Sequence, residues 1–100
     1  EGLNEKKDLC MIIGMLNTKD PLNYVREFSN IKLIKTIEIP GEENSLTAKE
    51  LKDKLLSLHD DVSEENSIED AIRSIASSNP DARILICGSL YLAGQVLKLN

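Results

Sequence analysis

The sequence contains few aromatic rings and little positive charge. Its 100 residues include no Trp, one Phe and two Tyr, and 17 Asp and Glu outnumber 12 Lys and Arg, which gives a formal net charge of −5. Proteins that bind nucleic acids need a positive surface for the phosphates, and those that bind single strands usually stack bases on aromatic rings. We therefore exclude nucleic acid as a partner.

Long apolar runs are also absent. No stretch approaches the roughly 20 apolar residues that a membrane-spanning helix needs, and the charged residues 5–8 are unlike the start of a signal peptide. We expect a soluble, cytoplasmic protein with no membrane partner. A length of 100 residues allows one domain and excludes a large self-contained enzyme.

Cysteine and histidine are scarce. Cys10 and Cys87 each lie in an aliphatic run, and this setting predicts buried thiols that pack as small hydrophobic groups. His59 is the one histidine and is interpreted as a polar residue that ends a helix. Without a second histidine or a zinc-like cysteine spacing, no metal site is predicted. A nucleophilic Cys87 or Ser89 lacks a positioned base, so no catalytic residue is assigned.

Three apolar segments predict strands. Residues 9–14 and 83–87 are almost continuously aliphatic, which is typical of strands buried on both faces of a parallel sheet. Residues 31–39 alternate, which predicts a strand with one more solvated face. A short further strand is expected around Val62.

Helix-start signals follow the first strand. Asp20 can cap a helix that has Pro21 at its first position, within residues 17–29. The apolar residues of this helix recur at three-residue steps and share one side. These residues are Leu22, Val25 and Phe28.

Two further helices have their own signals. Thr47 and Glu50 have capping-box spacing, which predicts a helix that runs to about Leu58. The acidic residues 60–70 are interpreted as a solvated loop with helix-start carboxylates and not as a metal site. Ser67 begins the next helix, which ends before Pro80.

The end of the chain is expected to form a tight turn at Gly88 and Ser89 and then a helix over residues 90–97. The resulting order is β-α-β-α-(β)-α-β-α. Strands that alternate with helices in this way predict a three-layer, Rossmann-like α/β sandwich with a mostly parallel sheet, in one domain over residues 1–100.

Two strand-to-helix junctions are the candidate binding residues, because ligands of parallel α/β sheets bind at the carboxyl ends of the strands. The first junction contains Lys19 and Asp20, and the second contains Gly88 and Ser89. Lys19 is either solvated beside a capping Asp20 or pairs with a carboxylate or phosphate. Ser89 is either a helix cap or a ligand contact. Neither junction is a complete phosphate loop, because G-x-x-x-x-G-K-[ST] and G-x-G-x-x-G are both missing.

Four segments resemble a known family in the same order along the chain. Residues 84–96, ILICGSLYLAGQV, are similar to the C-terminal motif of folylpolyglutamate synthase and the bifunctional dihydrofolate synthase, in the Mur ligase superfamily. Residues 13–20, IGMLNTKD, resemble the family's G-M-L-x-x-K-D segment. Residues 39–51 and 67–76 resemble its proline-containing loop with the following helix start, and its alanine-containing helix.

The resemblance implies the C-terminal domain of an ATP-dependent ligase that joins a folate or dihydropteroate to glutamate. By matching position, it places Lys19, Asp20, Gly88 and Ser89 near glutamate and the acyl phosphate. ATP and Mg²⁺ would be bound mainly by an N-terminal domain that these residues do not contain, so the chain alone is expected to be inactive.

The sequence departs from the family at its start. The family's domain opens with a strand and an H-N-P-H type loop, and this chain begins after that point. We therefore expect a truncated domain or fragment whose partner is the N-terminal ATPase domain, and a full-length enzyme that is a monomer. Two alternatives stay open: a stand-alone α/β module that binds a small anion or another partner, and an oligomerisation domain.

Overall fold

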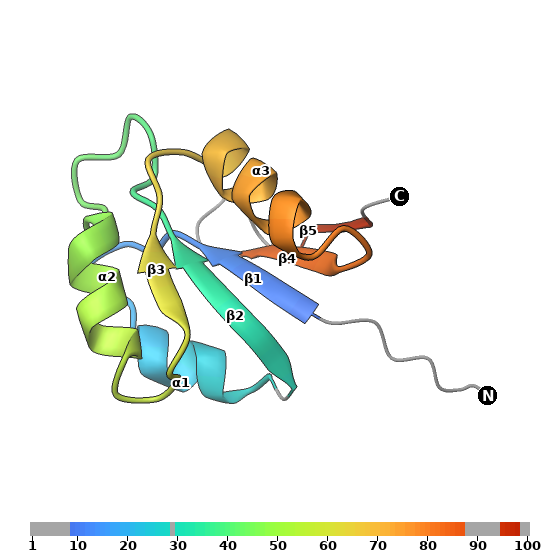
Figure 1. The fold of residues 1–100 in the computed structure, drawn as a ribbon. Coiled ribbons are helices and arrows are strands. Elements are labelled where there is room, and N and C mark those ends of the chain that lie inside the picture. Colours follow the sequence, from blue (N-terminus) through green and yellow to red (C-terminus); the bar gives the residue numbers. More distant parts are fainter. Residues whose placement is uncertain (1–8, 29, 88–94, 99–100) are drawn as a thin grey trace.

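The fold is a single five-stranded sheet with helices on both faces (Figure 1). A computed structural model describes residues 9–28, 30–87 and 95–98. The strands are β1 (Leu9–Ile13), β2 (Ile31–Thr36), β3 (Val62–Glu64), β4 (Arg83–Cys87) and β5 (Gln95–Lys98), and the helices are α1 (Pro21–Arg26), α2 (Ala48–Leu55) and α3 (Ile68–Ser78). The strand order is β3-β2-β1-β4-β5, in which β1 to β4 are parallel and β5 is antiparallel to β4.

The helices form one layer on each side of the sheet. Val25 of α1 and Leu51 and Leu55 of α2 pack on one face, and Ala71 and Ile75 of α3 pack on the other. Successive residues of β1 alternate between the two cores and are buried from Cys10 onward, and those of β4 do the same from position 84 onward. The predicted three-layer α/β sandwich, with strands at 9–14 and 83–87 buried on both faces, is confirmed.

The predicted helix starts are also confirmed. Asp20 caps α1, which has a proline at its first position. Thr47 and Glu50 form the reciprocal capping box of α2, with Thr47 N–H donating to Glu50 Oε1 at 2.9 Å and Glu50 N–H to Thr47 Oγ1 at 3.1 Å. Ser67 caps α3 through the Asp70 amide.

Three elements are shorter than the sequence predicts. The first helix, α1, ends at Arg26, so Phe28 lies beyond it. β2 ends at Thr36, because this residue is the last partner of both β1 and β3, although Ile37 and Ile39 beyond it remain buried. The second helix ends at Leu55, and Leu58 lies in the following turn with 38% of its surface exposed. Leu58 therefore does not extend the buried stripe of α2.

The predicted terminal helix is wrong for its last residues. Gln95–Lys98 form β5, which pairs with β4 in antiparallel register from Ile86↔Gln95 to Arg83↔Lys98. Only residues 88–94 separate the two strands, and a parallel crossover needs about a dozen residues or more, so a neighbouring strand has to return antiparallel. The rest of that predicted helix, residues 90–94, lies outside the described residues.

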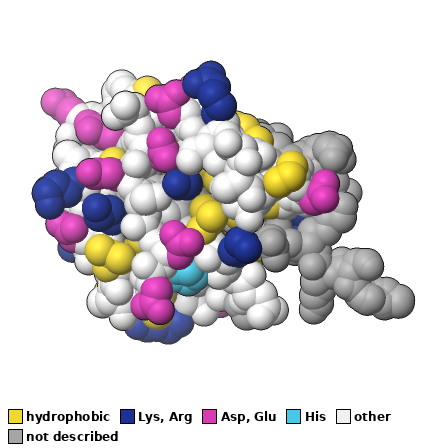
Figure 2. Space-filling model, viewed as in Figure 1, with side chains coloured by type: hydrophobic (Ala, Val, Ile, Leu, Met, Phe, Trp, Pro, Cys, Tyr) yellow, Lys and Arg dark blue, Asp and Glu magenta, His cyan; other side chains and the backbone are white. Residues whose placement is uncertain are grey.

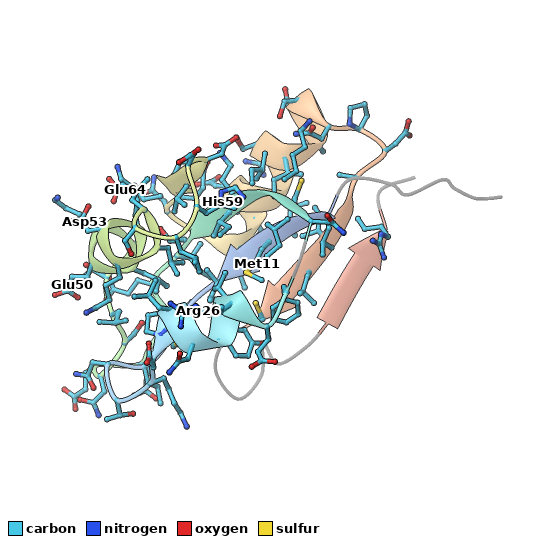
Figure 3. The ribbon with its side chains drawn as sticks, turned by 90° about the horizontal axis from the view of Figure 1, so that it is seen from below. Met11, Arg26, Glu50, Asp53, His59 and Glu64 are labelled. Atoms are coloured by element: carbon cyan, nitrogen blue, oxygen red, sulfur yellow. The ribbon has the colours of Figure 1, made fainter. Side chains whose placement is uncertain are left out.

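The surface carries charges of both signs. The face in Figure 2 shows acidic and basic side chains interspersed, with apolar side chains in small separate patches. Figure 3 shows Glu50 and Asp53 on the outer side of α2, away from Met11 in the core. Among the described residues, no helix has both the length and the apolar character to cross a membrane.

Candidate functional site

The first strand-to-helix junction begins at the carboxyl edge of the sheet, as predicted. Gly14 N–H donates to Cys87 O at 3.2 Å, which joins the ends of β1 and β4, and Leu46 N–H donates to Met15 O at 2.8 Å. The helices that connect the strands on one side of this point lie on one face of the sheet, and the helix that leads to β4 lies on the opposite face. The boundary between β1 and β4 is therefore the topological switch point, where sheets of this kind bind ligands. Gly88 and Ser89, which follow β4, lie outside the described residues.

Gly14 allows the chain to pass closely over its neighbours at this edge. A Cβ atom added there would lie 3.0 Å from Ile39 Cγ1 and 3.3 Å from the Ile37 carbonyl oxygen. A side chain here would therefore be closer to the segment after β2 than ordinary van der Waals contact, and that segment would have to move by a few tenths of an ångström. Glycine is needed here for space, since its backbone is not in the left-handed region.

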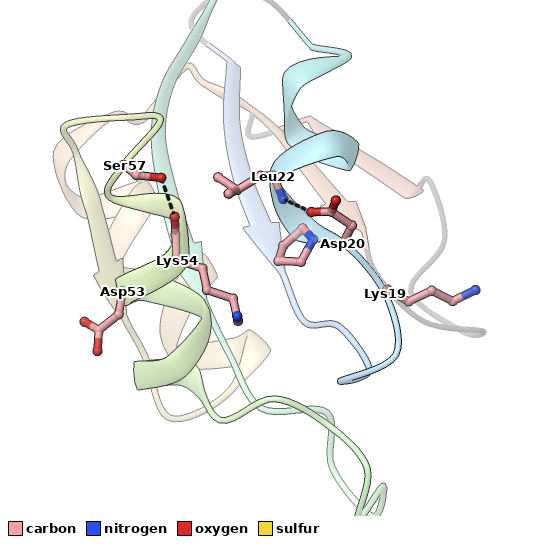
Figure 4. Close-up of a pocket in the computed structure, with 7 residues that line it drawn as sticks. Lys19, Asp20, Leu22, Asp53, Lys54 and Ser57 are labelled. Carbon is pink, nitrogen blue, oxygen red and sulfur yellow. Dashed lines mark hydrogen bonds between the residues drawn. The ribbon is translucent and has the colours of Figure 1, made fainter.

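Lys19 and Asp20 line a groove between the start of α1 and α2. The groove has a volume of about 440 Å³ and is shown in Figure 4. One wall is formed by the junction and the start of α1, and its residues are Lys19, Asp20, Pro21 and Leu22. The other wall is formed by α2 and the turn after it, and its residues are Asp53, Lys54 and Ser57. The groove brings together two of the four predicted site residues.

Asp20 acts as a helix cap. Its Oδ1 accepts from the Leu22 and Asn23 amides at 3.2 and 3.3 Å, and its Oδ2 accepts from Asn23 Nδ2 at 2.8 Å. Both carboxylate oxygens are thus held at the start of α1. Within the described part of the chain no ion pair involves Lys19, which is exposed. Of the two alternatives, capping by Asp20 is confirmed.

Lys54 is a residue of this groove that sequence reasoning missed. Figure 4 shows its side chain on the side of α2 that faces α1, whereas Asp53 points away. Asp53 pairs with Lys49 at 3.3 Å, one helical turn earlier, and Lys54 has no such partner among the residues described. The sequence gives Lys54 an i,i+4 partner in Glu50, but Glu50 Oε1 accepts from the Thr47 amide in the capping box, so no local signal marked Lys54 as a groove residue.

The match to a family model covers nearly the whole chain. The family described as the dihydrofolate synthetase C-terminal domain matches residues 3–99. The chain belongs to this family. The resemblance seen in the sequence motifs is thereby confirmed, and the family implies a ligase when the enzyme is full-length. Comparisons with curated proteins and with solved structures gave no significant match.

This dihydrofolate synthetase domain does not supply the ligands for a resident magnesium ion in its described part. No group of three or more His, Cys, Asp or Glu side chains converges there. A second groove of about 500 Å³ is rich in carboxylates but is formed by a surface loop, with Glu38, Glu42, Glu43 and Asn66 among its lining residues. These residues do not fit the ion, and we derive no step through it from this chain.

Both cysteines of the dihydrofolate synthetase domain are buried thiols that form no disulfide, as predicted. The Cys87 thiol donates to the Ile12 carbonyl at 3.7 Å. Burial raises the pKa of this thiol to about 12, and the nearby Tyr24 hydroxyl opposes that rise. Burial and the nearby thiol raise the pKa of Tyr24 to about 12 as well. Cys87 is therefore a neutral thiol near pH 7, which agrees with its assignment as a packing residue.

His59 does not end a helix as the sequence predicted, because α2 ends at Leu55 and His59 lies beyond the turn that follows it. Its Nδ1 accepts from the Asp61 amide at 3.0 Å, so the proton is on Nε2, which donates to the Ile31 carbonyl at 2.8 Å. The ring joins the start of β2 to the loop before β3. His59 is occupied by backbone groups, which agrees with a structural role.

Proposed function

We propose that this chain is the part of an ATP-dependent folate:glutamate ligase that closes on the ATP-binding domain and helps to place glutamate at the activated carboxyl group. The observation that carries the proposal is the family match over residues 3–99. The three-layer fold supports it, because a parallel sheet presents its strand ends to a ligand or to a facing domain.

The chemistry needs a bound, correctly oriented glutamate. Its amine forms a bond to the carboxyl carbon of the acyl phosphate, the carbon–oxygen bond to phosphate breaks, and the amine loses a proton as phosphate leaves. Glutamate offers carboxylates that ammonium groups bind. Lys19 lies beside the switch-point junction in a groove whose carboxylates are already engaged, so it suits a substrate carboxylate.

The remaining parts of the reaction are assigned to the N-terminal ATPase domain of the same enzyme. ATP and Mg²⁺ bind mainly there, because this chain has no phosphate-loop motif and its described part has no group of magnesium ligands. The pterin part of the substrate also binds largely outside this chain. We propose a monomeric, cytoplasmic enzyme in which domain closure completes the site.

The test compares this chain alone with a protein in which it is joined to its ATP-binding domain. Labelled glutamate is supplied with ATP, Mg²⁺ and either dihydropteroate or tetrahydrofolate, and amide formation is measured. We expect turnover from the joined protein and none from the chain alone. Turnover by the chain alone above a Ser89→Ala control, or a folded joined protein that forms no amide, would contradict the proposal.

The lysine-lined groove also favours a second function, a stand-alone module that binds a small anion. That function predicts saturable binding of glutamate or a nucleotide by the chain alone, together with no amide formation by the joined protein. The same pair of proteins therefore separates the two functions.

A further inference from the structure

We infer that Ser45, in the loop between β2 and α2, is a positioning residue for glutamate, because its hydroxyl holds the backbone turn that carries Lys19. This inference rests on the proposed function and deepens it, since it names the residue that keeps the first strand-to-helix junction in the shape that receives the substrate carboxylate. Ser45 itself does not touch the reacting atoms.

The Ser45 hydroxyl is engaged as both acceptor and donor. It accepts a hydrogen bond from the Ile39 N–H at 3.0 Å and donates one to the Leu46 carbonyl at 2.8 Å. The backbone N–H of Ser45 also donates to the Glu42 carbonyl at 3.1 Å. Because Ile39 is buried, its amide depends on the serine oxygen for a partner. The hydroxyl therefore fixes the loop at the point where it returns to the sheet.

The returning loop pairs with the junction that follows β1. Ser45 forms an antiparallel bridge with Leu16, and the residues on either side of this bridge are joined through their backbones at 2.8 Å. These hydrogen bonds run from Leu46 N–H to Met15 O and from Asn17 N–H to Asn44 O. We call the paired segments 15–17 and 44–46 the edge ribbon, because they lie beyond the carboxyl ends of the strands.

The edge ribbon leads directly into the turn that carries Lys19. Lys19 N–H donates to the Leu16 carbonyl at 3.1 Å, and Asp20 follows at once as the cap of α1. The backbone of Lys19 is thus held between the edge ribbon and the helix cap. Its side chain extends away from α2 in Figure 4 and makes no ion pair within the described ranges. The backbone therefore sets where this ammonium group can meet a carboxylate.

Loss of the Ser45 hydroxyl removes one of these two anchors. In Ser45→Ala the buried Ile39 amide loses its acceptor, and the loop has to shift to find another one. Since Leu16 lies opposite Ser45, the shift reaches the Lys19 turn, whereas Asp20 still holds the start of α1. A displaced positioning group weakens substrate binding without loss of the fold.

Ser67 supplies the matched control. Its hydroxyl also accepts from a backbone amide, that of Asp70 at 3.0 Å, but it caps α3, which packs on the opposite face of the sheet from α1 and α2. Ser67→Ala should therefore lower the midpoint of urea unfolding, as Ser45→Ala does, and leave the Lys19 turn in place.

The first experiment measures amide hydrogen exchange in the isotope-labelled chain by NMR. In Ser45→Ala the amides of Asn17 and Lys19 should exchange about two- to tenfold faster than in the parent, the range that the loss of one hydrogen bond supplies. Ser67→Ala should leave these rates unchanged, and Ser45→Thr, which keeps the hydroxyl, should restore them. Ser45→Cys has a weaker bonding group of similar size and should give an intermediate rate, so it carries the comparison if Ser45→Ala does not fold. Parent-like rates in the alanine or cysteine variant would overturn the inference.

The second experiment uses the protein joined to its ATP-binding domain. Ser45→Ala should raise the KM for glutamate about two- to tenfold and leave the KM for ATP unchanged, and Ser45→Thr should restore the KM for glutamate. A merely structural role would lower the amount of active enzyme, and hence the apparent kcat, with the KM for glutamate unchanged, as expected of Ser67→Ala. If Ser45→Ala behaves like Ser67→Ala, the inference is overturned while the proposed function stands. If the parent joined protein forms no amide, the proposed function fails and the role of Ser45 toward glutamate fails with it.

Discussion

The Thr36 hydroxyl donates a 2.7 Å hydrogen bond to the Ala48 carbonyl and thereby joins the end of β2 to the first turn of α2. Thr36 is the one buried polar residue in the described core. Its position is set from both sides, because Thr36 is paired with Ile13 of β1 and Glu64 of β3. The contact therefore fixes where α2, and with it one wall of the groove, begins against the sheet.

Thr36→Val tests this contact. The substitution keeps the shape of the side chain but places a methyl group against the Ala48 carbonyl, so we expect a loss of about 0.5–1.5 kcal/mol in the free energy of unfolding. Urea denaturation followed by circular dichroism measures it. Thr36→Ser keeps the hydroxyl and should retain the hydrogen bond. If valine is as stable as serine, the hydrogen bond does not stabilise the β2–α2 connection.

Much of the fold could be predicted because its signals are local. Asp20, Thr47 and Ser67 mark helix starts through side chains that bond to amides two or three residues away. The aliphatic runs of β1 and β4 predict burial on both faces without knowledge of their neighbours. Each of these features depends on a few consecutive residues, and the sequence contains all of them.

Gly14→Ala tests the close approach at the carboxyl edge. The added methyl group would meet Ile39 Cγ1 at 3.0 Å and the Ile37 carbonyl oxygen at 3.3 Å, so we expect a loss of about 1–3 kcal/mol in thermal or urea unfolding. Gly41 is the matched comparison, because it has open space but a φ of 75°. Gly41→Asn should be tolerated, since asparagine adopts this backbone region readily. A Gly14→Ala protein as stable as Gly41→Asn would show that the junction moves freely.

The groove and the last strand could not be predicted from local signals. Lys54 was part of the solvated face of a helix, and only the packing of α1 beside α2 makes it line a groove. The segment Gln95–Lys98 became a strand because β4 has a free edge that a short return can reach. Leu58 fits the heptad-like spacing of Leu51 and Leu55 but lies beyond the last helical turn. In each case the outcome depends on neighbours distant in sequence.

Because the Cys87 thiol is buried, we expect the free energy of unfolding to decline at high pH. Its pKa rises from an ordinary 9.0 to about 12 on folding, so between these values the folded chain keeps a proton that the unfolded chain has lost. This contribution is fully present below pH 9 and is lost progressively as the pH rises toward 12. Urea unfolding from pH 7 to 10.5 should show the decline, and Cys87→Ala should show a shallower one.

The same burial should protect Cys87 from alkylation. Thiolate is the reactive form, and both the raised pKa and the lack of exposed surface lower its accessible amount. We expect iodoacetamide at pH 8 to label Cys87 far more slowly in the folded chain than in urea, as followed by mass spectrometry of the Cys10→Ala variant. Equal labelling rates in the two conditions would contradict a buried thiol.

Variants of Asp20 distinguish a structural role of this residue from a direct role in ligation. Because its carboxylate caps α1 through the Leu22 and Asn23 amides, Asp20→Ala should lower the free energy of unfolding by about 1 kcal/mol, whereas Asp20→Ser, which retains a capping oxygen, should restore most of it. In the protein joined to its ATP-binding domain, Asp20→Ser should then keep the KM for glutamate close to that of the parent. Lys19→Gln should raise that KM without the loss of stability, because Lys19 is exposed and its role is to meet an anion. A stable Asp20→Ser protein with a large loss of kcat would instead place the carboxylate in the reaction itself.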